Sequence, residues 1–259
     1  MTCLSVTLGS IVMDGSTDAD GITWGWRGLP GWWEGGEIQT DVFGRLADDG
    51  SGFGESWRRG RAFDVVGTAL ALSSADPVET LLVARRKLVT AVDDKTDTTF
   101  LVDEGDTMGV LRASVRQSRA PRFPPVPSER AFLFEVPVMS ADWRKVSNTE
   151  TQTTVGAGGT VTNGGNVAAT PKLRISGDSG ANVGVTNVTT GETISTSLNL
   201  TGGDVLIIDN ATMTATLNGA DAEIALGSEF FDLAVGNNTV NLVNAGSASL
   251  RVDFRDSWK

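Results

Sequence analysis

The stretch TNGGNVAATPKLRISG, residues 162–177, decides how the second half of the chain folds, because two different structures fit a glycine-rich segment of this kind. A phosphate-binding loop follows a strand, opens a helix and carries a lysine after its glycines. Here the glycines lead through Pro171 into residues 172–176, where basic and apolar side chains alternate. The pattern predicts a strand and no phosphate site. We interpret the glycine-rich part as the seam between two domains.

The remainder of the second half shows short apolar runs separated by turn signals every eight to twelve residues or so. The strand candidates are KLRIS, VGVTNV, SLNL, DVLIID, TMTATLNG, AEIAL, FFDLAV, TVNLVN and SLRVDF, with GDSG, TTGE, TGGD, NGAD, GNN and NAGS between them. No segment after residue 150 has a helical pattern. This rhythm predicts a β-sandwich or jelly roll.

The first half mixes strands with one helix. Apolar residues alternate at Leu4, Val6 and Leu8, at Ile22, Trp24 and Trp26, at Leu111, Ala113 and Val115, and at Phe132, Phe134, Val136 and Val138. A helix is predicted from Asp76 to Val92, because Asp76 suits the N-cap, Pro77 the first helical position and Glu79 a capping box. Its predicted apolar stripe is Val78, Leu81, Leu82, Leu88, Val89 and Val92. Arg85 lies in the middle of this stripe and is expected at its edge, with its guanidinium in water.

Charge density separates the two halves. Residues 1–150 contain 16 of the 21 Lys and Arg residues and 22 of the 32 Asp and Glu residues. The second half is rich in asparagine and threonine, and Pro171 is its only proline. We therefore expect a mainly β chain of two domains, residues 1–148 with a β-sandwich-like fold and one helix, and residues 149–259 forming a β-sandwich.

Missing residue types exclude several kinds of chemistry. The 259 residues include no histidine, no tyrosine and one cysteine, Cys3, so Ser-His-Asp and Cys-His catalysis and zinc sites built on histidine are excluded. The net charge of −11 argues against a surface that grips nucleic acid through its phosphates. No apolar run is long enough for a membrane helix, and the N-terminus lacks the features of a signal peptide. We expect no cofactor and no metal.

Carboxylate clusters leave a glycosidase as an alternative from the enzyme class. The clusters ADDG (47–50), DDKTD (93–97) and DEGD (103–106) are flanked by glycine, threonine or strand ends, and we interpret all three as solvated turns. The segment DDKTDTT lacks the central glycine and the closing glutamate of a calcium loop. Four glycosylation sequons, at Asn187, Asn199, Asn210 and Asn237, are interpreted as accidents of an Asn- and Thr-rich domain.

Two tryptophans, Trp32 and Trp33, lie in the loop LPGWWEGG at 29–36. They either pack inside the domain or anchor a contact between proteins, where tryptophan is favoured. Under the second interpretation they are candidate subunit-interface residues. Replacing both with alanine is then expected to weaken assembly without unfolding the monomer. Sugar binding by the second domain is the remaining alternative, although only Phe230, Phe231, Phe254 and Trp258 are available there as stacking rings.

The order of motifs resembles a known family. The first domain opens with LGSIVMDG and DGITW, passes through RLADDGSGFGESWRRGRAFDVVGTALAL and ends with FLFEVPVMSADWRKVS; NGGNVAATPKLRISG, VTNVTTGETISTSLNLTGGDVLIIDN and FFDLAVGNNTVNL follow. This order resembles the distal tail proteins of long-tailed, non-contractile bacteriophages, over nearly the whole chain.

The resemblance implies a structural virion protein and no enzyme. It implies a belt domain that assembles into a homohexameric ring and a galectin-like second domain that projects from the ring. The ring is expected at the tail tip, between the tail tube and the baseplate hub, with a channel for the tape-measure protein and DNA. The alternative is a carbohydrate- or receptor-binding tail-tip component. The resemblance also implies synthesis in the host cytoplasm, no membrane partner and no specific binding of DNA.

Overall fold

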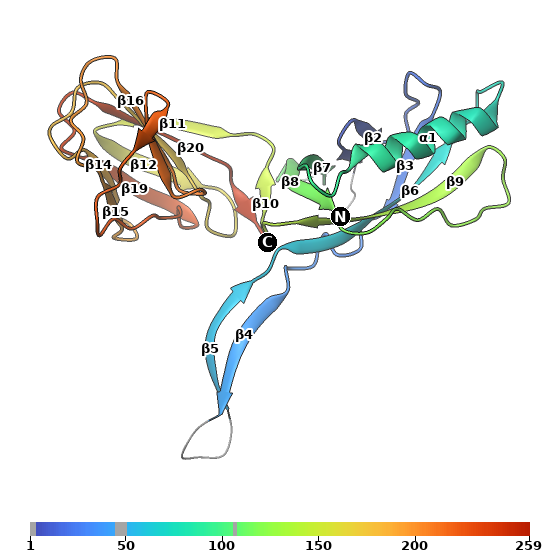
Figure 1. The fold of residues 1–259 in the computed structure, drawn as a ribbon, viewed down its shortest axis with the longest axis horizontal. Helices are drawn as coiled ribbons and strands as arrows, with labels where there is room; N and C mark the ends of the chain where they lie inside the picture. Colours follow the sequence, from blue (N-terminus) through green and yellow to red (C-terminus); the bar gives the residue numbers. More distant parts are fainter. Residues whose placement is uncertain (1–3, 45–50, 106–107) are drawn as a thin grey trace. The chain divides into compact units, whose positions relative to one another are not determined.

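The computed structural model describes residues 4–44, 51–105 and 108–259. The chain divides into two compact units, Met1–Asn148 with Lys259, and Thr149–Trp258 (Figure 1). Residues 162–177 therefore lie inside the second unit, and our interpretation of that stretch as the seam between domains was wrong. The glycines Gly164 and Gly165 mislead because they lie between two strands of the same unit, residues 158–163 and 172–176. The strand predicted after Pro171 is present as residues 172–176.

The first unit contains ten strands and one helix among its described residues. In chain order they are β1 (Ser5–Leu8), β2 (Ile11–Met13), β3 (Thr23–Gly28), β4 (Ile38–Gly44), β5 (Ser51–Arg58), β6 (Arg61–Leu70), α1 (Pro77–Ala91), β7 (Thr98–Asp103), β8 (Val110–Gln117), β9 (Ala131–Ser140) and β10 (Lys145–Ser147). The predicted strands around residues 4–8, 22–26, 111–115 and 132–138 are all present. The alternating patterns of β4 to β7 were not recognised as strands.

Most of these strands form one antiparallel sheet in the order β2-β1-β7-β8-β9-β6-β3, and β10 pairs with β8. Strands β7 and β6 are three positions apart, which is about 14 Å in a flat sheet. Nevertheless the rings of Phe100 on β7 and Phe63 on β6 are 4.9 Å apart. The sheet therefore folds over itself, and β8 passes from one layer to the other by pairing with β9 only near its end, at Arg116 and Gln117. The result is the predicted sandwich-like domain.

Side chains alternate along β6 and β9, so that one face of each strand is buried between the layers. Gly67 on β6 is paired with Phe134 on β9 and lies directly beneath the ring of that residue. A Cβ atom at Gly67 would overlap the ring and would lie 2.6 Å from the carbonyl oxygen of Gly25 on β3. Glycine is required here because the neighbouring strand and ring occupy the volume of a side chain.

Helix α1 begins where the sequence predicted. The carboxylate of Asp76 accepts a hydrogen bond from the backbone N–H of Glu79, and Pro77 is the first helical residue. The helix contacts β6 and β9. Its buried residues are Leu81, Ala84 and Leu88, and Val92 is buried just after its end. Burying each leucine contributes about 2 kcal/mol to stability.

Only part of the predicted apolar stripe of α1 is buried. Val78, Leu82 and Val89 are 55%, 40% and 49% exposed. The reason is geometric: at 100° per residue these three lie on a separate row, turned away from the row that contacts the sheet. Arg85 is exposed, as predicted, and its guanidinium lies over the rings of Phe123 and Phe132.

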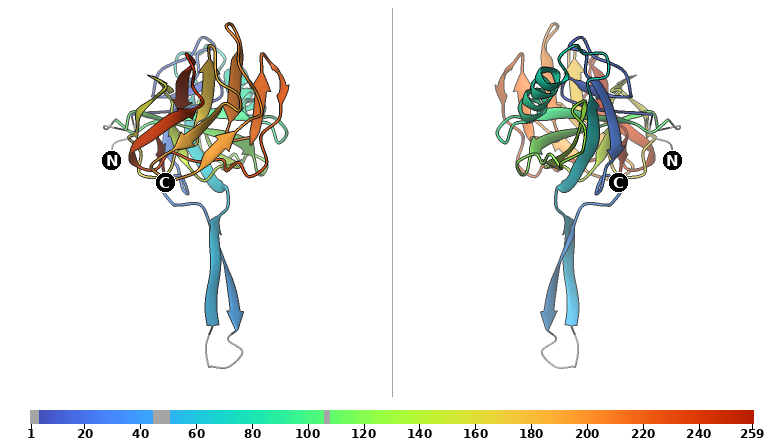
Figure 2. Two further views of the ribbon diagram at one scale, coloured as in Figure 1. Left: turned by 90° about the vertical axis from the view of Figure 1, so that its left-hand side faces the viewer. Right: turned by 90° about the vertical axis from the view of Figure 1, so that its right-hand side faces the viewer.

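Strands β4 and β5 form a separate two-stranded sheet. Their register runs from Ile38 opposite Arg58 to Gly44 opposite Ser51, with an irregularity between Thr40 and Val42. Figures 1 and 2 show this hairpin extending away from the rest of the first unit. Among the described strands, β4 and β5 pair only with each other.

The second unit is a sandwich of two antiparallel sheets, in the orders β11-β20-β13-β16-β17-β18 and β12-β19-β14-β15. Its strands are β11 (Thr151–Gly156), β12 (Gly158–Asn163), β13 (Lys172–Ser176), β14 (Gly184–Asn187), β15 (Thr193–Ser195), β16 (Val205–Asp209), β17 (Thr214–Leu217), β18 (Ala220–Ala222), β19 (Gly236–Val243), β20 (Ser249–Phe254) and β21 (Ser257–Trp258). The prediction of a mainly β chain with one helix and a C-terminal β-sandwich is confirmed.

Three predicted strands of this unit are wrong. AEIAL contributes only Ala222 to β18 and an isolated bridge at Ile224. SLNL forms no strand, and FFDLAV contributes only an isolated bridge between Leu233 and Ala169. Both segments nevertheless bury apolar side chains, Leu200 in the first and Phe231 and Leu233 in the second. The alternation of apolar residues correctly predicted that these side chains are buried. The backbone N–H and C=O groups of the two segments, however, bond to loops and not to a continuous neighbouring strand.

Candidate functional site

The tryptophan-containing loop that follows β3 is the first candidate contact region. Leu29, Pro30 and Gly31 form a β-turn in which the N–H of Trp32 donates to the carbonyl of Leu29, at 3.0 Å. Gly31 has a φ of +89°, which fits glycine after proline in a type II turn. A Cβ atom at Gly31 would lie 2.6 Å from the carbonyl oxygen of Ala62. The turn therefore brings the loop against β6 and aims Trp32 into the core.

Trp32 is completely buried. Its ring packs edge-on against Phe63 at 5.2 Å and Phe100 at 5.1 Å, and its Nε1–H donates to Oε1 of Glu104 at 3.1 Å. The side chain is therefore enclosed by its own protomer. The ring has no exposed surface within this protomer, and a role for Trp32 at a subunit interface stays a prediction.

Three buried charged side chains surround Trp32. Arg61 and Lys145 lie 5.7 and 5.5 Å from its ring, and Glu104 binds its indole nitrogen. Burial lowers the pKa of Arg61 and also that of Lys145, and the positive charge of Arg61 lowers the pKa of Lys145 further. Glu104 opposes both shifts. Its Oε2 atom is buried and has no hydrogen-bond partner among the described residues.

Arg61 also links the tryptophan-containing loop to residues far away in the sequence through hydrogen bonds. Its Nη1–H donates to the carbonyl of Trp32, and its Nη2–H donates to the carbonyl of Trp143 at 2.8 Å. A planar guanidinium suits this role because it presents several donors in fixed directions. The arrangement locks the loop in place and contains no nucleophile paired with a base.

Trp33 differs from its neighbour, since 44% of it is exposed. It lies in the segment that leads from the buried turn to the β4–β5 hairpin. At the base of that hairpin, Arg58 donates from Nη1 to the carbonyl of Gly36 at 3.3 Å, and its guanidinium lies 5.1 Å from the ring of Trp143. Arg59 donates from Nε to Gln39 at 2.8 Å. The contact with Trp143 attaches the base of the hairpin to the rest of the first unit, and the two hydrogen bonds join the arms of the hairpin to each other.

The carboxylate clusters have different environments. The segment 93–97 is an exposed bend, as predicted. Residues 47–50 and Asp106 lie outside the described residues, as does Cys3. Glu104, which we interpreted as part of a solvated turn, is instead only 3% exposed. In the part of the chain that the structure describes, no group of three or more His, Cys, Asp or Glu residues is placed to hold a metal ion.

A separate ion pair network fastens the loop between β2 and β3. Asp18 accepts hydrogen bonds from Lys87 on α1 at 2.8 Å, from the indole of Trp24 at 3.0 Å and from the N–H of Ile22 at 3.0 Å. Burial alone would raise the pKa of Asp18, but these hydrogen bonds outweigh burial and its pKa is lowered. Asp20 also pairs with Lys87, whose own pKa is raised because its two carboxylate partners outweigh its burial.

Two of the four sequons have structural roles. Asn187 is fully buried, and Asn210 is 5% exposed. Asn210 donates to the carbonyl of Pro171 at 2.9 Å and accepts from the N–H of Phe231 at 3.0 Å, which closes a loop of the sandwich. Asn199 and Asn237 are exposed.

Aromatic side chains of the second unit are mostly unavailable for stacking on a sugar. Phe231, Phe254 and Trp258 are 3%, 2% and 9% exposed, whereas Phe230 is half-buried. A flat aromatic platform of the kind expected in a lectin site is therefore not built from these rings. In the described ranges, no helix is long and apolar enough to span a membrane.

Our sequence analysis missed Arg61, Glu104 and Lys145. For two of the three, the sequence pattern could have predicted burial. Glu104 continues the alternation of Phe100 and Val102 on the inward face, and Arg61 precedes Phe63 with the same period of two. Lys145 has no comparable pattern, and its burial depends on packing alone.

The second unit matches a protein family. Residues 164–258 match the family model described as the siphovirus-type tail component, C-terminal domain. No curated protein sequence matches the chain.

Solved structures share the fold of both units. The crystal structure of SPP1 Dit, described as a paradigm of the hub adsorption apparatus in phages that infect Gram-positive bacteria, matches with a TM-score of 0.71. The match covers 91% of this chain and 94% of that chain, at 13% identity. A chain of the phage p2 baseplate in its activated conformation with Sr matches with a TM-score of 0.51 over 97% of each chain, at 9% identity. The same baseplate with Ca gives 0.50 over 98% of each chain, at 8% identity.

The family match and the shared fold support the predicted resemblance to distal tail proteins. For the second unit the match is to a siphovirus-type tail component, and for both units the solved structures show a shared fold.

Proposed function

We propose that this tail component forms a homohexameric ring at the tail tip, where it joins the tail tube to the baseplate hub. The observation that carries the proposal is the β4–β5 hairpin, which pairs with no other described strand. A two-stranded hairpin is only marginally stable alone in water. A neighbouring subunit that covers it would supply the missing contacts. Because one copy then gives its hairpin and another receives it, the contact is heterologous, and such a contact forms a ring when the rotation between successive copies closes.

The number six and the identity of the other partners come from the family resemblance. They are the tail tube protein, the hub protein and the tape-measure protein. The charge of the chain is consistent with this role, since a net charge of −11 would repel DNA from the wall of a channel. DNA would pass without specific binding. The protein would be made in the host cytoplasm and would act within the virion, as a structural part with no catalytic role.

Trp33 is the residue that we propose as a contact between subunits. It is exposed, it lies in the segment that precedes the hairpin, and tryptophan contributes strongly where a contact excludes water. Trp32 supports this contact only indirectly, by holding the loop in position.

Native mass measurement of the purified protein, with negative-stain images of the same sample, tests the proposal. Six-membered rings are expected, either from the protein alone or after co-expression with the hub protein. A Trp33→Ala variant should lower the fraction of rings. The matched control is Trp26→Ala, which replaces a half-buried tryptophan on β3 instead of an exposed one in the loop. A monomer that persists with the hub protein present would refute the ring.

A further inference from the structure

Helix α1 carries a second row of side chains whose apolar members are turned toward solvent. The row is Val78, Leu82, Arg85 and Val89, and its three apolar members are between 40% and 55% exposed. The spacing of four, three and four residues is that of successive d and a positions in a heptad. A row this narrow is the seam of a helix pair, whereas a helix that packs on a sheet presents a wider stripe.

Charges are ordered along this row. Asp76 and Glu79 lie at the start of the helix, Arg85 and Arg86 in its middle, and Asp93 and Asp94 just beyond its end. None of the described carboxylates forms an ion pair with Arg85, whose guanidinium rests on Phe123 and Phe132 at 5.2 and 5.3 Å.

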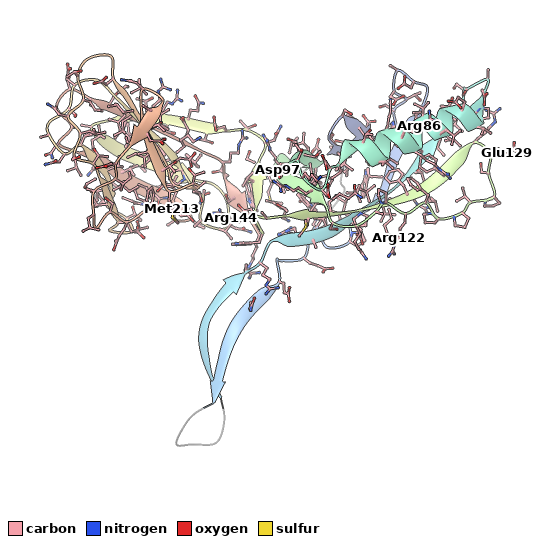
Figure 3. All side chains as sticks on the ribbon, viewed as in Figure 1. Arg86, Asp97, Arg122, Glu129, Arg144 and Met213 are labelled. Atoms are coloured by element: carbon pink, nitrogen blue, oxygen red, sulfur yellow. The ribbon has the colours of Figure 1, made fainter. Side chains whose placement is uncertain are left out.

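The neighbouring Arg86 is only loosely paired. Its distance to Glu79 is 3.9 Å, and the two side chains are 73% and 60% exposed. Figure 3 shows Arg86 on the helix, with Arg122 and Glu129 on the connection between β8 and β9. An exposed ion pair such as that between Arg86 and Glu79 contributes little to stability. Arg85 and Arg86 can therefore each pair with a carboxylate of another protein.

We propose that the exposed row of α1 binds an amphipathic helix of another protein. The partner helix would place apolar residues at heptad spacing against Val78, Leu82 and Val89. Its charges would follow the order basic, acidic, basic, so that the acidic part meets Arg85 and Arg86. A hollow of about 580 Å³ at the end of α1, lined in part by Val89, Asp93, Asp94 and Arg119, would receive the end of the partner helix.

A second copy of this chain does not fit the row. Within the described residues α1 is the only helix, so a helix pair between copies would be α1 against α1. The charge order acidic, basic, acidic reads the same in both directions. Parallel and antiparallel pairing in register would both set like charges against each other, which is unfavourable. The complementary order must come from a different chain.

Two designed three-heptad peptides test the proposal, with leucine at every a and d position. One carries lysine, glutamate and lysine in its successive heptads at e and g, and the other carries the reversed charges. Fluorescence anisotropy measures their binding to the full-length protein. The first peptide is expected to bind about tenfold more tightly than the second, because the matched pairs attract and the mismatched pairs repel.

Three variants locate the binding. Leu82→Glu is expected to weaken binding of the first peptide about tenfold, since one apolar contact is lost. Leu226→Glu makes the same substitution at a fully exposed leucine of the second unit and should leave binding unchanged. Arg85→Glu should reverse the preference between the peptides. Failure of both peptides to bind, equal binding of the two, or equal effects of Leu82→Glu and Leu226→Glu would overturn the proposal. The native mass of each variant should stay unchanged, because the proposed partner is a different protein.

Discussion

Replacing Trp32 with alanine should destabilise the first unit severely. The indole is fully buried against Phe63 and Phe100, and removal of a buried tryptophan side chain costs about 3–5 kcal/mol through lost contacts and the cavity left behind. The change also takes the hydrogen-bond donor from Glu104, whose other carboxylate oxygen already has no described partner. An unsatisfied buried polar group adds about 1–3 kcal/mol. The total approaches the roughly 5–15 kcal/mol that stabilises a whole domain.

Urea unfolding followed by tryptophan fluorescence measures this effect. All tryptophans except Trp258 precede residue 150, so the fluorescence reports mainly on the first unit. Trp32→Phe should keep most of the volume and lose the donor, with a cost of about 1–3 kcal/mol. Trp33→Ala is the matched control, and because its side chain is exposed it should change stability by no more than about 0.5 kcal/mol.

Equal unfolding midpoints for Trp32→Ala and Trp33→Ala would refute the reasoning, because they would mean that Trp32 is not part of the core. The expected result also changes how assembly must be tested. Replacing both tryptophans together would mix loss of folding with loss of a contact. Only Trp33→Ala, measured on a protein shown to be folded, tests the proposed contact between subunits.

Three further outcomes follow from the packing. Gly67→Ala should lower the free energy of unfolding by about 1–3 kcal/mol because its Cβ has no space, whereas Gly28→Ala, whose nearest neighbour would lie 3.8 Å away, should be nearly neutral in urea unfolding. The lowered pKa of Asp18 implies stability that is complete above the ordinary pKa of aspartate, about 3.9, and is lost as the pH falls through the lower folded value. Asp18→Asn should therefore flatten the acid limb of a plot of stability against pH, and an unchanged limb would contradict the assignment. Asn210→Ala should lower the stability of the second unit by about 1–3 kcal/mol, as measured by circular dichroism, while the exposed Asn199→Ala should have no measurable effect.

The sequence by itself determined the features that depend on neighbours along the chain. The N-cap at Asp76 and the start of α1 follow from side chains that bond to backbone groups within one turn. Alternation with a period of two identified β9 and β20, because each strand has one face toward the core. The order of motifs pointed to the tail-component family whose model matches residues 164–258. None of these inferences required knowledge of which strands pair.

Burial was decided only by the tertiary structure. Trp32 and Trp33 are adjacent and chemically identical, yet only Trp32 is buried, because the turn at Gly31 directs it between two layers of a sheet that folds over itself. Glu104 resembled a turn residue until Trp32, 72 positions away, was found to bind it. The two apolar rows of α1 are likewise equivalent in sequence, and the row that faces the sheet is chosen by strands distant in the chain. Such choices depend on contacts between residues far apart in sequence, which local patterns do not encode.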